Sequence, residues 1–413
     1  MAAQSVVMSA LDVLVAGGGI GGVASALAAA RAGCAVRLYE RAPMFSEVGA
    51  GIQLGPNATR ILQAWGLGDA LHAVAAFPER LRVRNASSGG TLGVLPLGKH
   101  MQARYGAPYA TIHRADIHGL LVRALAQQAD VHVNLDQALA GFSDDGRAVT
   151  VTVGHNNNTR VEGDVLIGAD GLWSSVRQQL LADGPPRMTG YLAYRAMLRQ
   201  SALPERLRST EVTAWLGRRL HVIQYPVRCG EWMNVVVIMQ GASPEDAQSW
   251  DQGAHAEDLQ RVMGNTCAPL RELISAAPDA SVNEYAWRLW ALADRAPVEQ
   301  AEQMARGLVV LLGDAAHPMR PFLAQGAGMA IEDAAGLAHA LTMDAVDVPT
   351  RLRRYALARW QRCARVQSRS IRNGQIFHST GLVRLGRDMS IKFLGARLLD
   401  VPWLYSHSGG APR

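Results

Sequence analysis

The chain has 413 residues, of which 49% are hydrophobic and 18% charged, and its formal net charge is +6. Roughly 100–200 residues form a typical domain, so this length predicts two or three structural units. The composition is that of a globular protein with no repeat and no low-complexity tract, and no run approaches 18 uninterrupted apolar residues. These properties argue against a fibrous protein, a disordered chain and a membrane-spanning protein.

The four cysteines, Cys34, Cys229, Cys267 and Cys363, are widely scattered. They form no CxxC pair, and no cluster of histidine and cysteine has the spacing of a metal site. The N-terminal apolar run follows no basic segment, which is not typical of a signal peptide. We therefore expect no metal site and a reduced, cytoplasmic setting.

The positive charge is dispersed, and its densest stretch, residues 351–372, has a helical period. We interpret this stretch as a solvated or docking helix face, which could serve a homodimer or a membrane surface. We expect no nucleic-acid partner. Positive potential also suits an anionic small-molecule substrate.

The first chemical pattern is "GGGIGG", a GxGxxG match at Gly17, Gly19 and Gly22 that also contains Gly21. It follows the apolar run Leu11–Ala16 and precedes a helical stretch and a second apolar strand. Glycines at these positions permit a tight turn, close approach to a pyrophosphate, and close packing of helix on strand. A strand, glycine turn, helix and strand in this order predict a dinucleotide site at the helix N-terminus.

An acidic residue, Glu40, ends the second predicted strand. It lies 18 residues after Gly22, where a carboxylate can accept hydrogen bonds from ribose hydroxyls. Arg41 beside it is either solvated or a phosphate contact.

Along the rest of the chain, mixed helix and strand patterns alternate with a β-rich region. Helical patterns cover 55–67 and 113–128, and a buried strand leads into a turn and helix within 162–181. Between about 190 and 290, β-rich runs joined by turn residues predict an antiparallel sheet. The α/β texture returns at 307–312, and the last 65 residues are mainly helical and basic. We therefore expect a discontinuous nucleotide-binding unit with a β-sheet module inserted into it.

Two further acidic residues follow apolar strands. Asp170 lies at the carboxyl end of one strand, where ligands bind in α/β proteins, and it could equally be a helix N-cap. Asp314 follows another strand and can accept hydrogen bonds from sugar-like hydroxyls, and a helix begins near Gly326 and Gly328. His317, between them, has either a turn role or a direct chemical role.

Together these three patterns, in this order, resemble the class A flavin-dependent aromatic monooxygenases over about residues 11–345. The resemblance implies FAD in an extended conformation, with Glu40 on the adenosine ribose and Asp314 on the ribityl chain. "GAGIQLGPNATRIL" and "HRADIH" resemble further segments of this family. They imply that Gln53 lies near the flavin ring and Arg114 near the phosphate or ribityl region, while the helix at Gly326 faces the pyrimidine side.

The implied fold is α/β, with a Rossmann-like FAD-binding domain, an inserted antiparallel β-sheet substrate domain and a C-terminal helical region. We expect the FAD-binding domain at 10–75, 105–180 and 290–345. The substrate domain is expected at 76–104 and 181–289, and the helical region at 346–413.

The resemblance also implies a reaction. NADH or NADPH binds transiently and reduces the flavin, and molecular oxygen then forms a flavin C4a-hydroperoxide that attacks a phenolic ring. The expected substrate is a hydroxylated aromatic carboxylate, and the expected reaction is 3-hydroxybenzoate to gentisate. Pro321 matches the more general family pattern, which leaves salicylate and 6-hydroxynicotinate as alternative substrates.

Catalytic residues are expected on the inserted sheet. In "RLHVIQYPV" strand alternation places His221, Ile223 and Tyr225 on one face. Histidine can accept a phenol proton near neutral pH, so His221 and Tyr225 are the catalytic candidates. The alternative is that both rings only fill the sheet. Tyr191, Tyr194 and Arg195 could bind a substrate carboxylate or could be packing residues.

Two other functional classes remain open. A flavin oxidase or dehydrogenase that oxidises its substrate directly shares GxGxxG and the acidic residue, although the patterns at Asp170 and Asp314 argue against it. A non-catalytic FAD-binding regulatory protein is the second, and His221 with Tyr225 argues against it.

Overall fold

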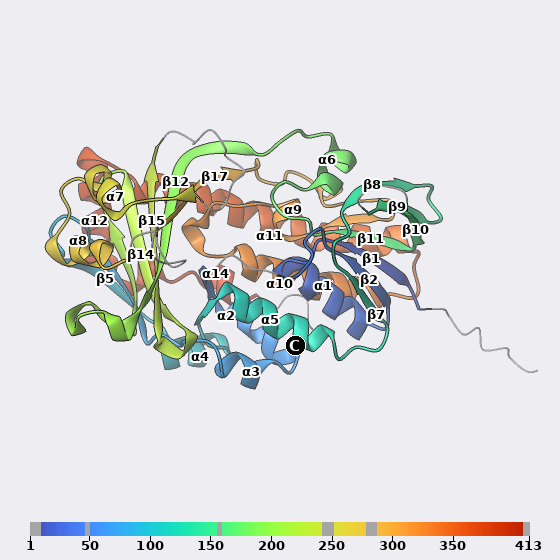
Figure 1. Cartoon of the computed structure of the whole chain (residues 1–413), viewed down its shortest axis with the longest axis horizontal. Helices are drawn as coiled ribbons and strands as arrows, with labels where there is room; N and C mark the ends of the chain where they lie inside the picture. The colour runs from blue at the N-terminus through green and yellow to red at the C-terminus, as the bar shows by residue number, and fades with distance from the viewer. Residues whose placement is uncertain (1–9, 46–49, 155–158, 242–251, 278–286, 408–413) are drawn as a thin grey trace, which may run out of the picture.

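The computed structural model describes residues 10–45, 50–154, 159–241, 252–277 and 287–407. Figure 1 shows an elongated molecule with a parallel sheet and its helices at one end and a large antiparallel sheet at the other. The long helix α11 (Val348–Phe377) and helix α10 (Gly326–Leu341) lie between the two ends. The expected α/β fold is therefore confirmed, with both parallel and antiparallel sheets.

The first sheet has the strand order β18-β19-β11-β1-β2-β7, and its pairs are parallel except for the edge pair β18–β19. Its central strands are buried and almost wholly apolar, as parallel strands covered on both faces are. Helix α1 (Ile20–Arg31) connects β1 to β2, as the sequence predicted. The strands are β1 (Asp12–Ala16), β2 (Ala35–Tyr39), β7 (Val131–Asn134), β11 (Val165–Gly168), β18 (Ala305–Arg306) and β19 (Val309–Leu311).

The second sheet has the order β16-β17-β12-β15-β14-β13-β4-β5. The three β-rich runs expected between 190 and 290 are its strands β13, β14 and β15, and they pair antiparallel with one another. The hairpin β4–β5, from much earlier in the chain, joins this sheet by parallel pairing of β4 with β13. The strands are β4 (Arg80–Asn85), β5 (Thr91–Pro96), β12 (Arg187–Arg199), β13 (Val212–Leu216), β14 (Leu220–Val227), β15 (Trp232–Gln240), β16 (Gln252–Gly253) and β17 (Arg288–Asp294).

Smaller elements complete the two ends of the molecule. One small sheet contains β8 (Leu139–Asp144), β9 (Val149–Val153) and β10 (Thr159–Gly163), and another contains β3 (Gly51–Leu54) and β6 (Ala110–His113). The remaining helices are α2 (Pro56–Ala64), α3 (Gly68–His72), α4 (Gly98–Tyr105), α5 (Arg114–Leu125), α6 (Ser175–Leu181), α7 (Ala256–Met263), α8 (Ala268–Ser275), α9 (Gly313–Ala316), α12 (Gly381–Leu394), α13 (Ala396–Leu399) and α14 (Pro402–Tyr405). Among the described helices, none has the length and apolarity needed to cross a bilayer.

The basic stretch at 351–372 lies on α11, but it is not simply a solvated face. Arg353 and Arg354 are exposed, whereas the Arg359 side chain is only 3% exposed. Its guanidinium forms ion pairs with Glu332 and Asp333, two fully buried acids of α10, at 2.8 Å each. The sequence interpretation missed this face because the acids that Arg359 contacts belong to another helix.

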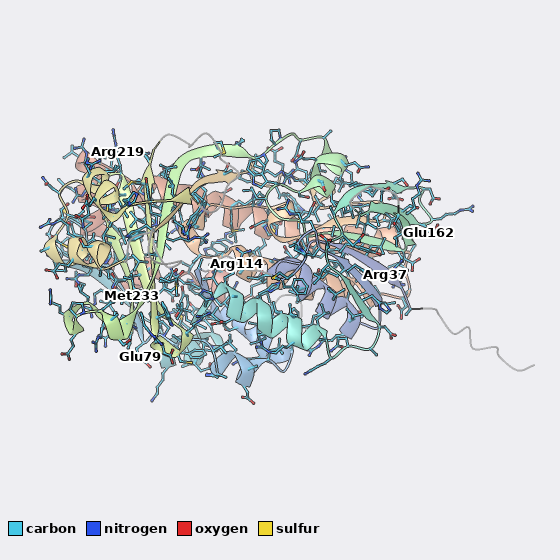
Figure 2. The ribbon with its side chains drawn as sticks, viewed as in Figure 1. Arg37, Glu79, Arg114, Glu162, Arg219 and Met233 are labelled. Atoms are coloured by element: carbon cyan, nitrogen blue, oxygen red, sulfur yellow. The ribbon has the colours of Figure 1, made fainter. Side chains whose placement is uncertain are left out.

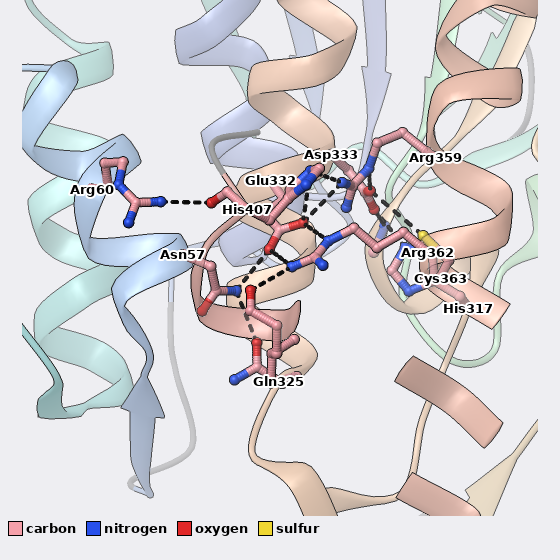
Figure 3. Close-up of polar contacts among 12 residues, drawn as sticks. Asn57, Arg60, His317, Gln325, Glu332, Asp333, Arg359, Arg362, Cys363 and His407 are labelled. Atoms are coloured by element: carbon pink, nitrogen blue, oxygen red, sulfur yellow. Dashed lines mark hydrogen bonds and ion pairs between the residues drawn. The ribbon is translucent and has the colours of Figure 1, made fainter. Parts of the chain in front are cut away.

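Figure 3 shows how this buried ion-pair network joins α10 to α11. Arg362 adds two bonds of 2.6 Å to the Glu332 carboxylate, and Asn57 of α2 donates to it at 2.7 Å. Burial alone would raise the pKa of Glu332, but the charges of Arg359 and Arg362 outweigh it and lower the pKa to about 2. Because this pKa is depressed in the folded state, the network stabilises the protein above about pH 4.5. That stabilisation is lost as the pH falls toward about 2.

Replacing Arg359 with methionine should be strongly destabilising, because it leaves two buried carboxylates short of a cation. Removing one partner of a buried ion pair typically costs about 3–5 kcal/mol. The measurement is the free energy of unfolding from urea denaturation at pH 7. Arg353→Met, at an exposed position of the same helix, is the matched control and should change stability by less than about 0.5 kcal/mol. Equal stability of the two variants would contradict the energetic role of the network.

Candidate functional site

A cavity of about 930 Å³ extends from the carboxyl ends of the parallel strands to the face of the antiparallel sheet. The first turns of α1 and α10 line it on one side, and β14 and β15 line it on the other. Arg114, another lining residue, lies in the middle of the molecule in Figure 2, between the two sheets. Ligand pockets commonly have volumes of about 300–1,000 Å³, so this one can hold a large ligand.

The glycine turn between β1 and α1 forms one end of the cavity. Gly17 has a φ of +101°, and a Cβ added to Gly22 would lie 1.8 Å from the Gly17 carbonyl oxygen, so both positions need glycine for the turn itself. Gly19 differs, because a Cβ there would meet no atom within 4 Å. Gly19 and Gly21 line the cavity. The turn thus leaves open space next to the N–H groups that begin α1.

Glu40 stabilises this turn through hydrogen bonds to the backbone. Its carboxylate accepts hydrogen bonds from the backbone N–H groups of Gly18, at 2.6 Å, and Ala42, at 2.8 Å. Arg41 is exposed. The described residues that line the cavity do not include Glu40, Arg41, Gly17 or Gly22.

Asp170 acts as a helix cap. Its carboxylate accepts from the backbone N–H groups of Ser175, at 2.8 Å, and Val176, at 3.2 Å, which begin α6. The neighbours Ala169 and Gly171 line the cavity, whereas the lining formed by the described residues does not include Asp170. The cap therefore positions the strand end that faces the ligand space.

Asp314 and the N-terminus of α10 meet in the middle of the cavity. Asp314, Gly326 and Ala327 line it, and Gly328 packs behind them against Ala58. The Asp314 side chain is exposed and lines the cavity. Loss of hydration among the surrounding protein atoms raises the pKa of its carboxyl, while the charges of His317 and Arg114 act to lower it. The first turn of α10, like that of α1, contains no acidic residue.

Gln53 and Arg114 reach the cavity from β3 and from the start of α5. Tyr109 donates a hydrogen bond of 2.6 Å to the Gln53 side-chain oxygen, which holds the amide in place. The backbone N–H of Arg114 donates to the Ala50 carbonyl at 2.7 Å. These two bonds fix the strand and helix that carry Gln53 and Arg114.

These residues fit FAD. Two helix N-termini with no acidic residue in their first turns supply N–H donors and partial positive charge at separate points along the cavity, and the open space at Gly19 lets a pyrophosphate approach the backbone. Asp314 and Gln53 also line the cavity and offer hydrogen-bond acceptors to the ligand. The site can therefore bind an elongated anionic ligand with sugar-like hydroxyls.

The antiparallel sheet closes the opposite side of the cavity. His221, Ile223 and Tyr225, alternate residues of β14, all line it. Burial lowers the pKa of His221 well below its usual value, and the charge of Arg387 acts in the same direction, so the imidazole is neutral near pH 7. Burial raises the pKa of Tyr225, whose hydroxyl therefore stays protonated.

The three candidates for binding a substrate carboxylate, Tyr191, Tyr194 and Arg195, lie in different surroundings. Arg195 lines the cavity, with its guanidinium 4.1 Å from the Trp290 ring centroid. Tyr191 packs against Phe322, and Tyr194 packs into the hydrophobic cluster on the other face of the sheet. Arg195 is thus the member of the three that meets the ligand space.

His317 does not line the cavity formed by the described residues. It is fully buried, with Nε2 2.5 Å from Asp333 Oδ2, and its ligand atom lies with those of Asp333 and Cys363 within 4.8 Å of one another. The sequence showed no such cluster because these residues are far apart in the chain. The Arg359 guanidinium donates to the same Asp333 carboxylate, so the cluster already contains a cation.

Sequence reasoning also missed His378, which follows α11. Its Nε2 lies 2.9 Å from Nδ1 of His221. No motif surrounds it in "QIFHST", and 157 positions separate the two histidines, so no local signal could have paired them.

Comparison with known proteins agrees with this geometry. A family model described as FAD binding domain matches residues 10–370. The chain is 38% identical over 404 residues to a 3-hydroxybenzoate 6-hydroxylase of Polaromonas naphthalenivorans, which covers 97% of each chain. It is 35% identical over 361 residues to a 6-hydroxynicotinate 3-monooxygenase of Bordetella bronchiseptica, which covers 86% of this chain and 89% of that one.

Solved structures give the same result for the fold. A salicylate hydroxylase in a substrate complex has a TM-score of 0.80 at 25% identity, with 97% of each chain covered. Klebsiella pneumoniae HpxO, complexed with FAD and uric acid, has a TM-score of 0.83 at 22% identity and covers 97% of this chain and 96% of its own. The fold and the cavity thus define an FAD-binding α/β protein. The chain belongs to the FAD-binding domain family, and the expected resemblance to flavin-dependent aromatic monooxygenases is confirmed.

Replacing Gly19 with valine should weaken FAD binding at least about 10-fold, because the new side chain would enter the space beside the α1 N-terminus, where an added Cβ meets no protein atom within 4 Å. Flavin fluorescence titration of the apoprotein measures the affinity. Gly119→Ala, on the neighbouring helix α5, is the control and should leave it unchanged. An unaltered affinity in Gly19→Val would place the cofactor phosphates elsewhere.

Proposed function

We propose that this protein is an NAD(P)H-consuming hydroxylase of a phenolic aromatic acid, and that its reaction converts 3-hydroxybenzoate to gentisate. The observation that carries the proposal is the arrangement of one cavity, with FAD-type binding residues on one wall and His221 with Tyr225 on the other. The names of relatives at 35–38% identity support the choice of 3-hydroxybenzoate. In the reaction, one oxygen atom of O₂ enters the ring and the other leaves as water.

The cofactor wall has roles that follow from its chemistry. We assign the pyrophosphate to the Gly17–Gly22 turn, the adenosine side to Glu40, the ribityl chain to Asp314, and the ring to the α10 N-terminus near Gln53. When bound, FAD would supply the redox chemistry between NAD(P)H and oxygen. The N-terminus of α10 would stabilise negative charge on the bound ring. This wall comes from residues 10–75, 105–180 and 290–345, which we propose as the FAD-binding domain.

The substrate wall, proposed to belong to residues 76–104 and 181–289, holds the ring and its phenol. His221 is neutral and lines the cavity, so it can accept the phenol proton, which makes the ring electron-rich. Tyr225 keeps its hydroxyl proton and can donate to the substrate. The apolar side chains around them, including Ile223, Ile238 and Phe322, exclude water. Arg195 on the same wall carries the charge expected to bind the substrate carboxylate.

The primary test follows NADH and NADPH oxidation by the FAD-loaded protein with 3-hydroxybenzoate, salicylate and 6-hydroxynicotinate, with products identified by mass and chromatography. We expect 3-hydroxybenzoate to stimulate oxidation and to yield gentisate. Product from either other ring instead would move the assignment to that substrate. Oxidation of an aromatic acid without NAD(P)H would indicate a direct oxidase, and no response to any of the three would sink the aromatic-acid assignment.

His221→Ala should lower kcat for hydroxylation by about 100-fold, because general-base catalysis typically contributes 10²–10⁴-fold. FAD content should stay at the wild-type level, since His221 lies on the opposite wall. Product formation per NADH consumed measures the loss. His132→Ala, an exposed histidine of β7, is the control. A variant that still hydroxylates at the wild-type rate would remove His221 from the mechanism.

A further inference from the structure

The candidate base His221 is not isolated in the sheet, because a second imidazole contacts it. His221 Nδ1 and His378 Nε2 lie 2.9 Å apart, and the two side chains are 3% and 5% exposed. Phe322 packs edge-on against both rings, with centroid distances of 5.4 and 5.5 Å, and the Tyr191 ring lies 4.8 Å from His378. This packing holds both rings in one arrangement.

Of the two histidines, His221 faces the ligand space. It lines the cavity, whereas the described residues of that lining include Phe377 and Ser379 but not His378 between them. His378 therefore contacts His221 from behind and cannot meet a substrate directly. Its effect on the chemistry must pass through the shared hydrogen bond.

Both rings are neutral near pH 7. Burial lowers the pKa of His378 to about 4, and the charge of Arg387 on α12 adds to this effect. Burial also lowers the pKa of His221, and the charge of Arg387 again acts in the same direction. In a hydrogen bond between two neutral imidazoles, one ring nitrogen must donate and the other must accept. The tautomer of each ring therefore fixes the tautomer of the other.

The base role proposed for His221 selects one of the two possible directions of this hydrogen bond. Nδ1 of His378, the nitrogen turned away from His221, has no hydrogen bond of standard geometry among the described residues. If Nε2 of His378 were the donor, the hydrogen of His221 would lie on its Nε2, which could then accept no proton, so the base role of His221 requires hydrogen on Nδ1 of both rings. With hydrogen on Nδ1, Nε2 of His378 is the acceptor, and His221 must donate from its own Nδ1. This leaves the lone pair on Nε2 of His221.

We propose that His378 is a positioning residue that holds His221 in the tautomer with hydrogen on Nδ1, so that Nε2 accepts the phenol proton of the substrate. The inference rests on the proposed hydroxylase function. In this step the O–H bond of the phenol breaks and the Nε2–H bond forms, which leaves a phenolate beside a protonated His221. The step transfers one proton and no electrons. The negative charge of the phenolate stabilises the imidazolium at the moment it forms.

Two variants of His378 separate the hydrogen bond from the packing. Glutamine can present an acceptor near the position of Nε2, whereas leucine fills the space with no acceptor. We expect His378→Leu to lower kcat for hydroxylation by about 100-fold with little change in KM, and His378→Gln to stay within about 5-fold of the wild type. Equal effects of the two substitutions, whether large or small, would overturn the proposal. Thermal unfolding and FAD content per chain show that both variants are folded.

A spectroscopic readout tests the same point without turnover. Phenols and phenolates differ in ultraviolet absorption, so titration of 3-hydroxybenzoate into each FAD-loaded protein reports whether the bound substrate is ionised. The wild type and His378→Gln should bind the phenolate at pH 7.5, and His378→Leu should bind the phenol. Phenolate bound equally by all three would contradict the role of His378.

The tautomer itself is measured by long-range ¹H–¹⁵N spectra of the ¹⁵N-histidine-labelled holoenzyme, with His221 assigned through His221→Asn. We expect a protonated Nδ1 and an unprotonated Nε2, and the reverse pattern would refute the assignment. This result is independent of substrate identity. If the wild type hydroxylates none of the aromatic acids, the proposed function fails. If it does and the variants behave alike, only the role of His378 fails.

Discussion

The Asp333 carboxylate connects the cofactor side of the cavity to the interior of the protein. One of its oxygens accepts from the backbone N–H of Gly313, at 3.0 Å, and from His317; the other accepts from Arg359, at 2.8 Å. Burial raises the pKa of Asp333, but the charges of His317 and Arg359 outweigh it and lower the pKa to about 2, so it remains ionised. The turn that presents Asp314 to the cavity is thus fixed by an ion-pair network that includes α11. Preorganised groups of this kind need no rearrangement when a ligand binds.

The residues of the opposite wall are also held in place before a ligand binds. Strand alternation alone brings His221 and Tyr225 to the cavity, and close backbone approach brings β3 to them. A Cβ on Gly51 would lie 2.7 Å from the Tyr225 ring and 2.7 Å from Asn234, so only glycine lets the two segments meet. Asn234 then accepts a hydrogen bond of 2.8 Å from the Gly51 N–H. The two walls are therefore joined at β3, the strand that also carries Gln53.

Local patterns in the sequence predicted the elements that have local causes. The glycine turn before α1, the buried strands β1 and β11, and the two-residue alternation of β14 all follow from neighbouring residues, and each is found in the structure. Glu40 was predicted as a ribose ligand from its spacing and from the family resemblance, and the structure adds its bonds to the turn, which depend on how β2 ends. The parallel pairing of β4 with β13, the partners of Arg359 and the contact between His221 and His378 join distant segments. No spacing rule within one sequence encodes them.

The order of the strands has a consequence for synthesis. The backbone N–H of Asp12 donates to the Asp164 carboxylate, 152 positions later, and β11 in turn pairs with β19, which ends at residue 311. The parallel sheet therefore stays incomplete on the ribosome until residue 311 has emerged, although its first βαβ unit is made at once. Contacts of such high sequence separation fold slowly and leave strand edges exposed in the meantime. During translation the nascent chain must keep the edge of β11 unpaired while strands β12 to β17 of the antiparallel sheet are still being made.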